Sequence, residues 1–598
     1  MTAMDHEKHI EWKWGMLAAL AVMLLALYPQ VHLWAHEGRS WSGAYAYFDR
    51  DEVAYSAYLQ ALIDGRPRRN DPYTGYDEQG VALPESLFSI QFVAPYLAAI
   101  PARVLGLSAS TVFIVLMPAV AILSALALFW FLAMITNDSR VAAVGVLVIL
   151  CLSTLVSGKG PIGALLGEQF GWSYLPFLRR YLPNIPFPFF LALFGLVWKA
   201  ISGDRKQALV ACIAAGLIVA LLNYSYFYLW SGALAWLACV AIVWLIVRPQ
   251  GWQRLLYSLS VTGVISLLAA IPYLMLLKGR AGHSDQVQVM DYTRSPDLFR
   301  PSELFAFVLL AVVAYLIAQR RVSLKENRVL FAISLLLLPF VVFNQQILTG
   351  RSLQPFHYEE FVSSYSVLMA VVIGWGILCQ VRSHSRWASA RAMFWIAILS
   401  FAYGANGASG ISRAAFSDNL AHDETVVVGH RLRELYQENK RIAFPVDLRQ
   451  GDILPTFAPV PVLWAVHMSV FPGSSLPELK ERFHNFLYYS HISPEELNKL
   501  LTSRSYVPSL ALFGYERMGS HFVREFKPIT DEEISREVEL YREYVTSFSR
   551  ANAAKYVLGY LIVPAGAEFD ASSLDRWYDR NSGERVGDFM IYQLKLKP

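Results

Sequence analysis

Three acidic side chains, Asp49, Asp51 and Glu52, lie within four consecutive positions. Crowded carboxylates raise one another's pKa unless a cation or proton lies among them, and sites for proton transfer or metal binding use this arrangement. A single acid at the start of a helix needs no function, because it caps free N–H groups and suits the helix dipole. Three acids exceed what capping requires. The cluster is therefore a candidate catalytic or metal site, with a solvated charged surface as the alternative.

The element that positions these acids is predicted from residue spacing. Apolar and aromatic side chains recur at three- and four-residue intervals between Ala54 and Leu62, and Gly65 followed by Pro67 provides a stop. We expect an amphipathic helix within 48–65, with the acids at its start, of a kind that lies flat on a membrane. A second amphipathic stretch is expected over residues 84–105.

The composition places the chain among polytopic membrane proteins. Of its 598 residues, 55% are hydrophobic and only 16% are charged, whereas a soluble protein carries about 25% charged residues. The net charge of +4 does not point to nucleic acid as a partner. The four cysteines have unrelated spacings, so they predict neither a zinc site nor a disulfide framework.

Eleven apolar runs are candidate membrane spans. The first is too long for the core of a signal peptide and is expected to be retained. A spanning helix needs about 20 residues, and several of the runs are shorter than that. The runs cover residues 14–34, 108–135, 141–156, 185–201, 208–222, 226–247, 255–277, 301–318, 329–343, 365–381 and 392–405.

The short connections between the runs predict an orientation. Basic residues fall on alternate connections, as with Arg140, Lys199, Arg248, Arg320 and Arg391. Because positively charged loops tend to stay in the cytoplasm, the N-terminus is expected inside a cytoplasmic (inner) membrane. The acidic loop and everything after residue 410 are then expected outside.

The composition after residue 410 is that of a soluble domain. Helical patterns appear at 425–438, 476–490, 494–501 and 531–552, and strand-like runs appear at 441–446, 460–465, 556–563 and 588–596. This alternation predicts an extracytoplasmic α/β domain. The expected organisation is a transmembrane domain over 1–410, which includes a first outer loop over 35–107 with the amphipathic helices, and the α/β domain over 411–598.

The acidic loop resembles the first outer loop of the GT-C glycosyltransferases. That superfamily includes oligosaccharyltransferase catalytic subunits, protein O-mannosyltransferases and lipid A aminoarabinose transferases. The expected topology also agrees with this resemblance. The Trp-Trp-Asp signature of the oligosaccharyltransferases is absent, which disfavours asparagine-linked glycosylation. The matching residues are Asp49-Arg50-Asp51-Glu52, Tyr55, Tyr58, Gly65 and Pro67.

The resemblance implies an enzyme that transfers a sugar, with inversion, from a polyprenyl-phosphate carrier to a glycan, lipid or protein acceptor on the outer face of the membrane. Such a reaction belongs to glycan biosynthesis at the cell envelope. The acceptor hydroxyl loses its proton as it attacks, so a carboxylate within reach acts as general base. Asp51 matches the first acid of the motif and is the expected base. Asp49 is the second candidate, and Glu52 orients the base or binds a metal.

The leaving phosphate needs cations, and arginine forks match phosphate geometry. Arg179, Arg180 and Arg351 precede or join apolar runs on the expected outer side, with interfacial snorkelling as the alternative reading. His357 and Tyr55 are further candidates for substrate contact, although a lone histidine is more often structural.

A divalent cation, Mg²⁺ or Mn²⁺, is a possible cofactor, and Glu359 would join Asp51 and Glu52 as its ligands. In the last domain, Asp447, Asp452, Trp464 and His467 form a polar group that could line an acceptor site. Residues 464–467 are equally consistent with a strand that leads into buried packing.

Two other classes of function remain open. A transporter or flippase of lipid-linked substrates usually carries ionisable groups inside its spans, and these apolar runs hold none near their centres. An inverted repeat is also absent. A receptor or scaffold with an outer ligand-binding domain leaves the clustered acids unexplained. Motifs of soluble hydrolases, such as Gly-x-Ser-x-Gly and His-Glu-x-x-His, are absent.

Overall fold

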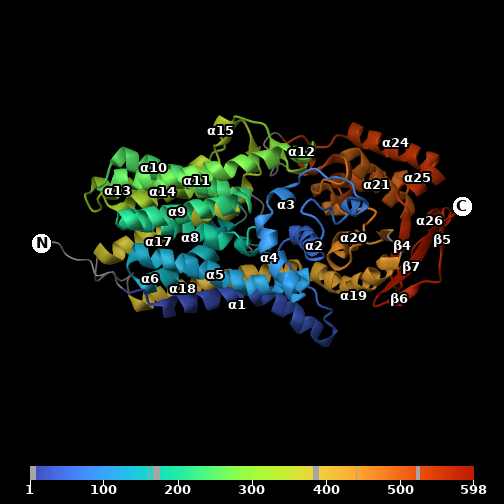
Figure 1. Cartoon of the computed structure of the whole chain (residues 1–598), viewed down its shortest axis with the longest axis horizontal. Coiled ribbons are helices and arrows are strands. Elements are labelled where there is room, and N and C mark those ends of the chain that lie inside the picture. Colours follow the sequence, from blue (N-terminus) through green and yellow to red (C-terminus); the bar gives the residue numbers. More distant parts are fainter. Residues whose placement is uncertain are drawn as a thin grey trace. The chain divides into compact units, whose positions relative to one another are not determined.

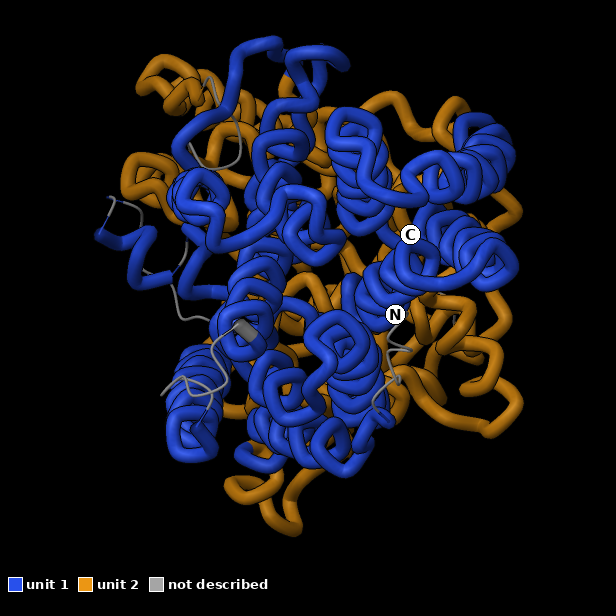
Figure 2. Tube along the Cα trace, turned by 90° about the vertical axis from the view of Figure 1, so that its left-hand side faces the viewer, with its two compact units in different colours: residues 1–32, 114–275, 292–415 blue, residues 33–113, 276–291, 416–598 orange. Residues whose placement is uncertain are grey.

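The computed structural model describes residues 9–158, 160–165, 167, 175–381, 389–438, 441–519 and 526–598. The chain divides into two compact units, shown in blue and orange in Figure 2. Unit 1 comprises Met1–His32, Ile114–Met275 and Tyr292–Ala415. Unit 2 comprises Leu33–Phe113, Leu276–Asp291 and Phe416–Pro598. The first loop, which the sequence analysis grouped with the spans, therefore packs in the same unit as the C-terminal residues.

All eleven predicted apolar runs fall on helices (Figure 1). Within the described residues, nine helices are long and apolar enough to cross a membrane. Two further apolar helices, α8 (Phe187–Ser202) and α14 (Asn327–Val342), have 16 residues each. The nine candidates contain α1 (Trp12–Glu37), α5 (Ala109–Thr136), α6 (Ser139–Leu152), α9 (Arg205–Asn223), α10 (Phe227–Val247), α11 (Trp252–Lys278), α13 (Pro301–Ala318), α17 (Ser364–Val381) and α18 (Ala390–Ala414).

Aromatic side chains fill the interior of unit 1. Trp236 of α10 lies 4.4 Å from Phe194 and 5.4 Å from Phe331, measured between ring centroids. Large apolar side chains such as Ile246 and Leu267 are exposed on the outside of the helices. A helix that is apolar on all sides suits a lipid environment. The chain is thus a multi-pass α-helical membrane protein. Short elements of unit 1 are α7 (Pro161–Leu165), α15 (Gln346–Thr349), β2 (Ser352–Leu353), α16 (Phe356–Tyr358) and η5 (Glu359–Ser363).

Unit 2 holds a small mixed sheet. Strand β3 (Ile442–Pro445) pairs in parallel with β4 (Leu558–Pro564), which pairs antiparallel with β7 (Phe589–Leu596). Two short strands, β5 (Tyr578–Arg580) and β6 (Glu584–Val586), also pair antiparallel with β7. The predicted strand at 460–465 is reduced to one isolated bridge between Val462 and Ala443.

Helices alternate with these strands along the C-terminal part of the chain, which confirms the predicted α/β domain. The predicted helix over 531–552 is two helices, with Phe548 as the C-cap residue of the first. The helices are α2 (Asp51–Ile63), α3 (Leu87–Ile90), α4 (Val93–Leu105), α12 (Ser284–Val287), α19 (Phe416–Glu438), α20 (Leu448–Phe457), α21 (Leu476–Tyr489), α22 (Pro494–Thr502), α23 (Tyr506–Phe513), α24 (Asp531–Ser547), α25 (Arg550–Lys555) and α26 (Ser572–Asp575), and a two-residue strand β1 covers Met290–Asp291.

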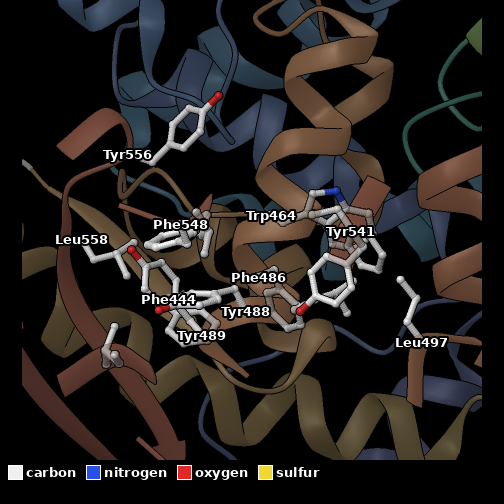
Figure 3. Packing of buried hydrophobic residues seen from close by; sticks show 14 of the residues in the cluster. Phe444, Trp464, Phe486, Tyr488, Tyr489, Leu497, Tyr541, Phe548, Tyr556 and Leu558 are labelled. Carbon is white, nitrogen blue, oxygen red and sulfur yellow. The ribbon is translucent and has the colours of Figure 1, made fainter. Parts of the chain in front are cut away.

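An aromatic core holds the sheet of unit 2 to its helices (Figure 3). Tyr488 of α21 stacks on Phe548 with ring centroids 3.8 Å apart. Phe444 of β3 meets Phe486 edge to face at 5.5 Å. Buried aromatic pairs add about 0.5–1.5 kcal/mol each beyond their area burial. This core fixes the segments that lead to and from η7 (Val466–Val470), which carries His467.

Helix α2 confirms the predicted helix, but its environment differs from the expectation of a membrane-surface helix. Its residues from Glu52 to Leu62 are buried except Tyr55, and it packs on α4 and α20 of the same unit. The amphipathic helix that does expose an apolar face is α4, where Ile100 and Val104 are exposed while Ala98 and Ala102 are buried.

Candidate active site

Helix α19 positions the extended segment that leads into α2. The carboxylate of Asp423 accepts hydrogen bonds from the backbone N–H groups of Ser42, Gly43 and Ala44, at 2.8, 3.2 and 2.9 Å. Its neighbour one turn earlier, Asn419, accepts from the N–H of Tyr47 at 3.0 Å. Hydrogen bonds from several N–H groups to one charged carboxylate are among the stronger hydrogen bonds in proteins. They fix the place where α2 begins.

The clustered acids have different surroundings. Asp49 accepts a hydrogen bond from the N–H of Asp51, the first residue of α2, at 2.9 Å. The carboxylate of Glu52 accepts from the N–H of Phe48 at 3.3 Å, and Glu52 is fully buried. The side chain of Asp51, by contrast, is 48% exposed. Asp51 thus offers a half-exposed carboxylate and Asp49 is half-buried, whereas Glu52 is closed off from a substrate.

Asp51 lies at one end of a chain of three side chains. Its Oδ1 atom is 3.7 Å from Nε2 of His467. The Nδ1 atom of His467 lies 2.5 Å from Oδ2 of Asp452, and the N–H of His467 donates to the other Asp452 oxygen at 3.0 Å. Asp452 belongs to α20, against which α2 packs. The first loop and the C-terminal domain therefore both contribute to this carboxylate-imidazole-carboxylate chain.

The central imidazole of this chain carries a positive charge at neutral pH. Burial by itself lowers the pKa of His467, but the carboxylates of Asp452 and Asp51 outweigh it and raise that pKa to about 10. A general base must be held in one orientation, and the His467 ring beside Asp51 favours one.

The C-terminal candidates separate into two groups. Asp452 and His467 lie in the chain that ends at Asp51. Asp447 instead caps α20 and pairs with Arg449 at 2.8 Å, and Trp464 is buried in the aromatic core. In the first loop, the half-buried ring of Tyr55 lies 5.6 Å from that of Phe88.

The predicted phosphate ligands Arg179 and Arg180 are buried within unit 1. The guanidinium of Arg179 donates to the carbonyl of Leu182 at 2.9 Å and to the hydroxyl of Tyr226 at 3.0 Å, and it lies 5.1 Å from the ring centre of Phe361. A guanidinium that snorkels to lipid headgroups would be exposed. Snorkelling therefore does not describe these two residues.

Arg351 and His357 differ in exposure. Arg351 is exposed, with its guanidinium 5.6 Å from the ring centre of Tyr292. The ring of His357 meets Tyr228 edge to face at 4.6 Å and stacks on Phe361 at 5.5 Å. Of the three predicted phosphate-binding arginines, Arg351 is thus the exposed one.

Glu359 is buried in unit 1, and its carboxylate lies 3.6 Å from the guanidinium of Arg300. Within the part of the chain that the structure describes, no group of three or more His, Cys, Asp or Glu side chains is suited to hold a metal ion. Asp51 and Glu52 belong to unit 2 and Glu359 to unit 1, and the divalent cation with these three ligands stays a sequence-based prediction.

Apolar helices and a small mixed sheet define the class: a multi-pass membrane protein with an α/β domain. No protein-family model matches the chain, and no curated protein sequence matches it. Among solved structures, ArnT from Cupriavidus metallidurans bound to undecaprenyl phosphate matches at 12% identity over 76% of this chain and 86% of that chain, with a TM-score of 0.40.

Proposed function

We propose that the chain transfers a sugar from a polyprenyl-phosphate carrier to an acceptor on the outer face of the membrane, with inversion at the anomeric carbon. Asp51 is the general base. The observation that carries the proposal is the half-exposed Asp51 carboxylate at the end of the chain formed with His467 and Asp452. Such an arrangement holds one carboxylate toward a substrate while its partners stay buried.

The reaction is a single displacement. An acceptor hydroxyl oxygen attacks the anomeric carbon from the face opposite the phosphate, and a new C–O bond forms as the bond to the phosphate oxygen breaks. The phosphate leaves with the bonding electron pair, and Asp51 takes the hydroxyl proton. His467 and Asp452 orient Asp51 and take no proton in this step. Inversion follows from attack on the opposite face.

The test compares full-length variants in membranes supplied with radiolabelled polyprenyl-phosphate sugars, with label counted in any acceptor. A general base contributes about 10²–10⁴ to a rate, so Asp51→Asn is expected to lower transfer at least about 100-fold at equal protein level. Asp64→Asn is the matched control, because Asp64 lies at the other end of α2 and pairs with Arg433. Wild-type transfer by Asp51→Asn would remove Asp51 as the base.

A further inference from the structure

Unit 2 contains a pocket of about 360 Å³ beside η7. Its walls come from α12, η7, α21, α23 and α24 together with residues 514–517. Pockets that bind small ligands typically have volumes from about 300 to 1,000 Å³. The pocket therefore has room for a ligand the size of one or two sugar rings.

The lining combines aromatic surface with balanced charge. Phe513 and Tyr515, both half-buried, contribute aromatic side chains. Three basic residues, Lys480, Arg517 and Arg536, face three acidic ones, Glu516, Glu533 and Glu537. Lys480 pairs with Glu537 at 2.6 Å, and Arg517 pairs with Glu533 at 2.7 Å. A pocket with no net charge favours a neutral ligand over an ion.

One polar atom in the wall is unsatisfied. Glu537 is 8% exposed, and its Oε1 accepts from Lys480. In the described part of the chain, its Oε2 is buried with no hydrogen-bond partner. A buried acceptor left unpaired costs about 1–3 kcal/mol or more when it is charged, so buried polar atoms are normally paired. Glu537 is among the residues that line the pocket, so a ligand hydroxyl that reaches this oxygen would supply the missing donor.

The pocket is adjacent to the candidate active site. Val466 and Ser469 line the pocket on either side of His467 in η7. Tyr515 also lines the pocket. Burial raises the pKa of its phenol, and the nearby Tyr506, Asp51 and Asp452 side chains raise it further. Tyr515 is therefore close enough to Asp51 and Asp452 to sense their charge. A ligand in this pocket would thus lie next to the residues that hold Asp51.

We propose that this pocket binds a neutral, hydroxyl-rich sugar ring of the acceptor, with the aromatic side chains against its C–H face and the Glu537 carboxylate accepting a hydroxyl hydrogen bond. The class of acceptor is then a glycan or glycolipid with an uncharged ring at this subsite. That the bound sugar is part of the acceptor rests on the proposed transferase function. The binding of a sugar to this pocket does not.

The experiment measures binding without any donor lipid, so it fails or succeeds independently of transfer. The full chain is placed in lipid nanodiscs, because glycoside detergents would compete. Saturation-transfer NMR then follows methyl glucoside, methyl galactoside and methyl mannoside, with glucuronate and glucosamine as charged probes. Glu537→Gln removes the carboxylate, and Ser469→Trp fills the pocket. Glu543→Gln, on an exposed face of the same helix, is the matched control.

We expect at least one neutral glycoside to bind the wild-type chain. Glu537→Gln is expected to bind it about tenfold more weakly, because a hydrogen bond to a charged group is lost. Ser469→Trp should abolish binding, and Glu543→Gln should leave it unchanged. No binding by any neutral glycoside, equal binding by all variants, or stronger binding of the charged probes would each overturn the proposal. Binding with these effects, but with wild-type transfer by Asp51→Asn, would keep the subsite and reject Asp51 as the base.

Discussion

The carboxylate of Asp452 makes two contacts with His467, one to the ring Nδ1 at 2.5 Å and one to the backbone N–H at 3.0 Å. Two contacts from one carboxylate fix both the position of η7 and the plane of the imidazole. The ring then presents Nε2 to Asp51. Asp452 is therefore a positioning residue, since it acts on the proposed base through the histidine.

The stability of the chain is expected to depend on pH through His467. Its pKa in the folded chain, about 10, lies above the ordinary value of 6.5. Its contribution to stability is therefore complete below about pH 6.5 and is lost as the pH rises through about 10. The difference in Tm between wild type and His467→Gln should shrink between these values.

Asp452→Asn provides the internal check on this pH effect. Without the Asp452 charge the pKa of His467 should fall, so the same loss of stability should occur at lower pH. Scanning fluorimetry of the purified chain at a series of pH values measures both effects. A Tm difference that stays constant with pH would show that His467 is neutral in the folded chain.

Asp423 anchors the segment before α2, and its removal is expected to loosen that segment. Asp423→Ala leaves three backbone N–H groups without their acceptor and should cost about 3 kcal/mol of unfolding free energy. Asp423→Asn keeps an acceptor oxygen and should cost less. The midpoint of thermal unfolding and the rate of proteolytic cleavage near Gly43 measure the change.

The control for Asp423 is an acid with few contacts. Asp579 is exposed, and its recorded ion pair is with Lys597 at 3.8 Å. Asp579→Ala should change the unfolding midpoint little, because exposed ion pairs contribute about 0–1 kcal/mol. Equal midpoints for Asp423→Ala and Asp579→Ala would mean that the Asp423 contacts do not hold the segment.

Local signals were sufficient to predict much of the fold. The helix over 51–63 followed from apolar spacing and from its stop, and Gly65 indeed adopts a positive φ of 91° just after the helix. The apolar runs predicted the membrane helices because hydropathy reports burial in lipid or protein directly. The short strands β5 and β6 were missed because three residues carry too little alternation to detect.

Contacts between distant segments were not predictable from periodicity. Ser56 of α2 and Thr456 of α20 hydrogen-bond at 2.7 Å across 400 positions of sequence. Periodicity shows which face of a helix is apolar, but it does not show which element covers that face. For that reason α2 was expected at a membrane surface, and the roles of Asn419 and Asp423 were not recognised. In the sequence, the only feature that points to Asn419 and Asp423 is their spacing of four residues, which places both on one face of a helix.

The prediction that Arg351 binds the donor phosphate has a kinetic test. Arg351→Ala should raise the KM for a polyprenyl-phosphate sugar about tenfold or more, because charge-assisted hydrogen bonds to phosphate are lost. Arg351→Lys should restore part of the affinity, since lysine keeps the charge but not the fork. Arg320→Ala, at an exposed position after α13, is the control. An unchanged KM for Arg351→Ala would exclude the phosphate contact.

The final prediction concerns Arg482, whose guanidinium is buried in unit 2. It pairs with Glu478 at 2.9 Å and donates to the hydroxyl of Tyr76, in the first loop, at 2.8 Å. Its guanidinium carbon also lies 4.4 Å from the ring centre of Tyr556. Arg482→Met removes one partner of a buried pair and should destabilise the chain by about 3–5 kcal/mol.

Most of the stability lost in Arg482→Met should come from the Glu478 carboxylate that is left without its partner, rather than from the attraction within the ion pair. The double variant Arg482→Met with Glu478→Gln removes the unpaired charge, so its unfolding midpoint should lie above that of Arg482→Met alone. Arg542→Met, which breaks an exposed pair with Glu495, should cost under about 1 kcal/mol. If the double variant is no more stable than Arg482→Met, the guanidinium acts through its contacts with Tyr76 and Tyr556, and the link between the first loop and α21 depends on those rings.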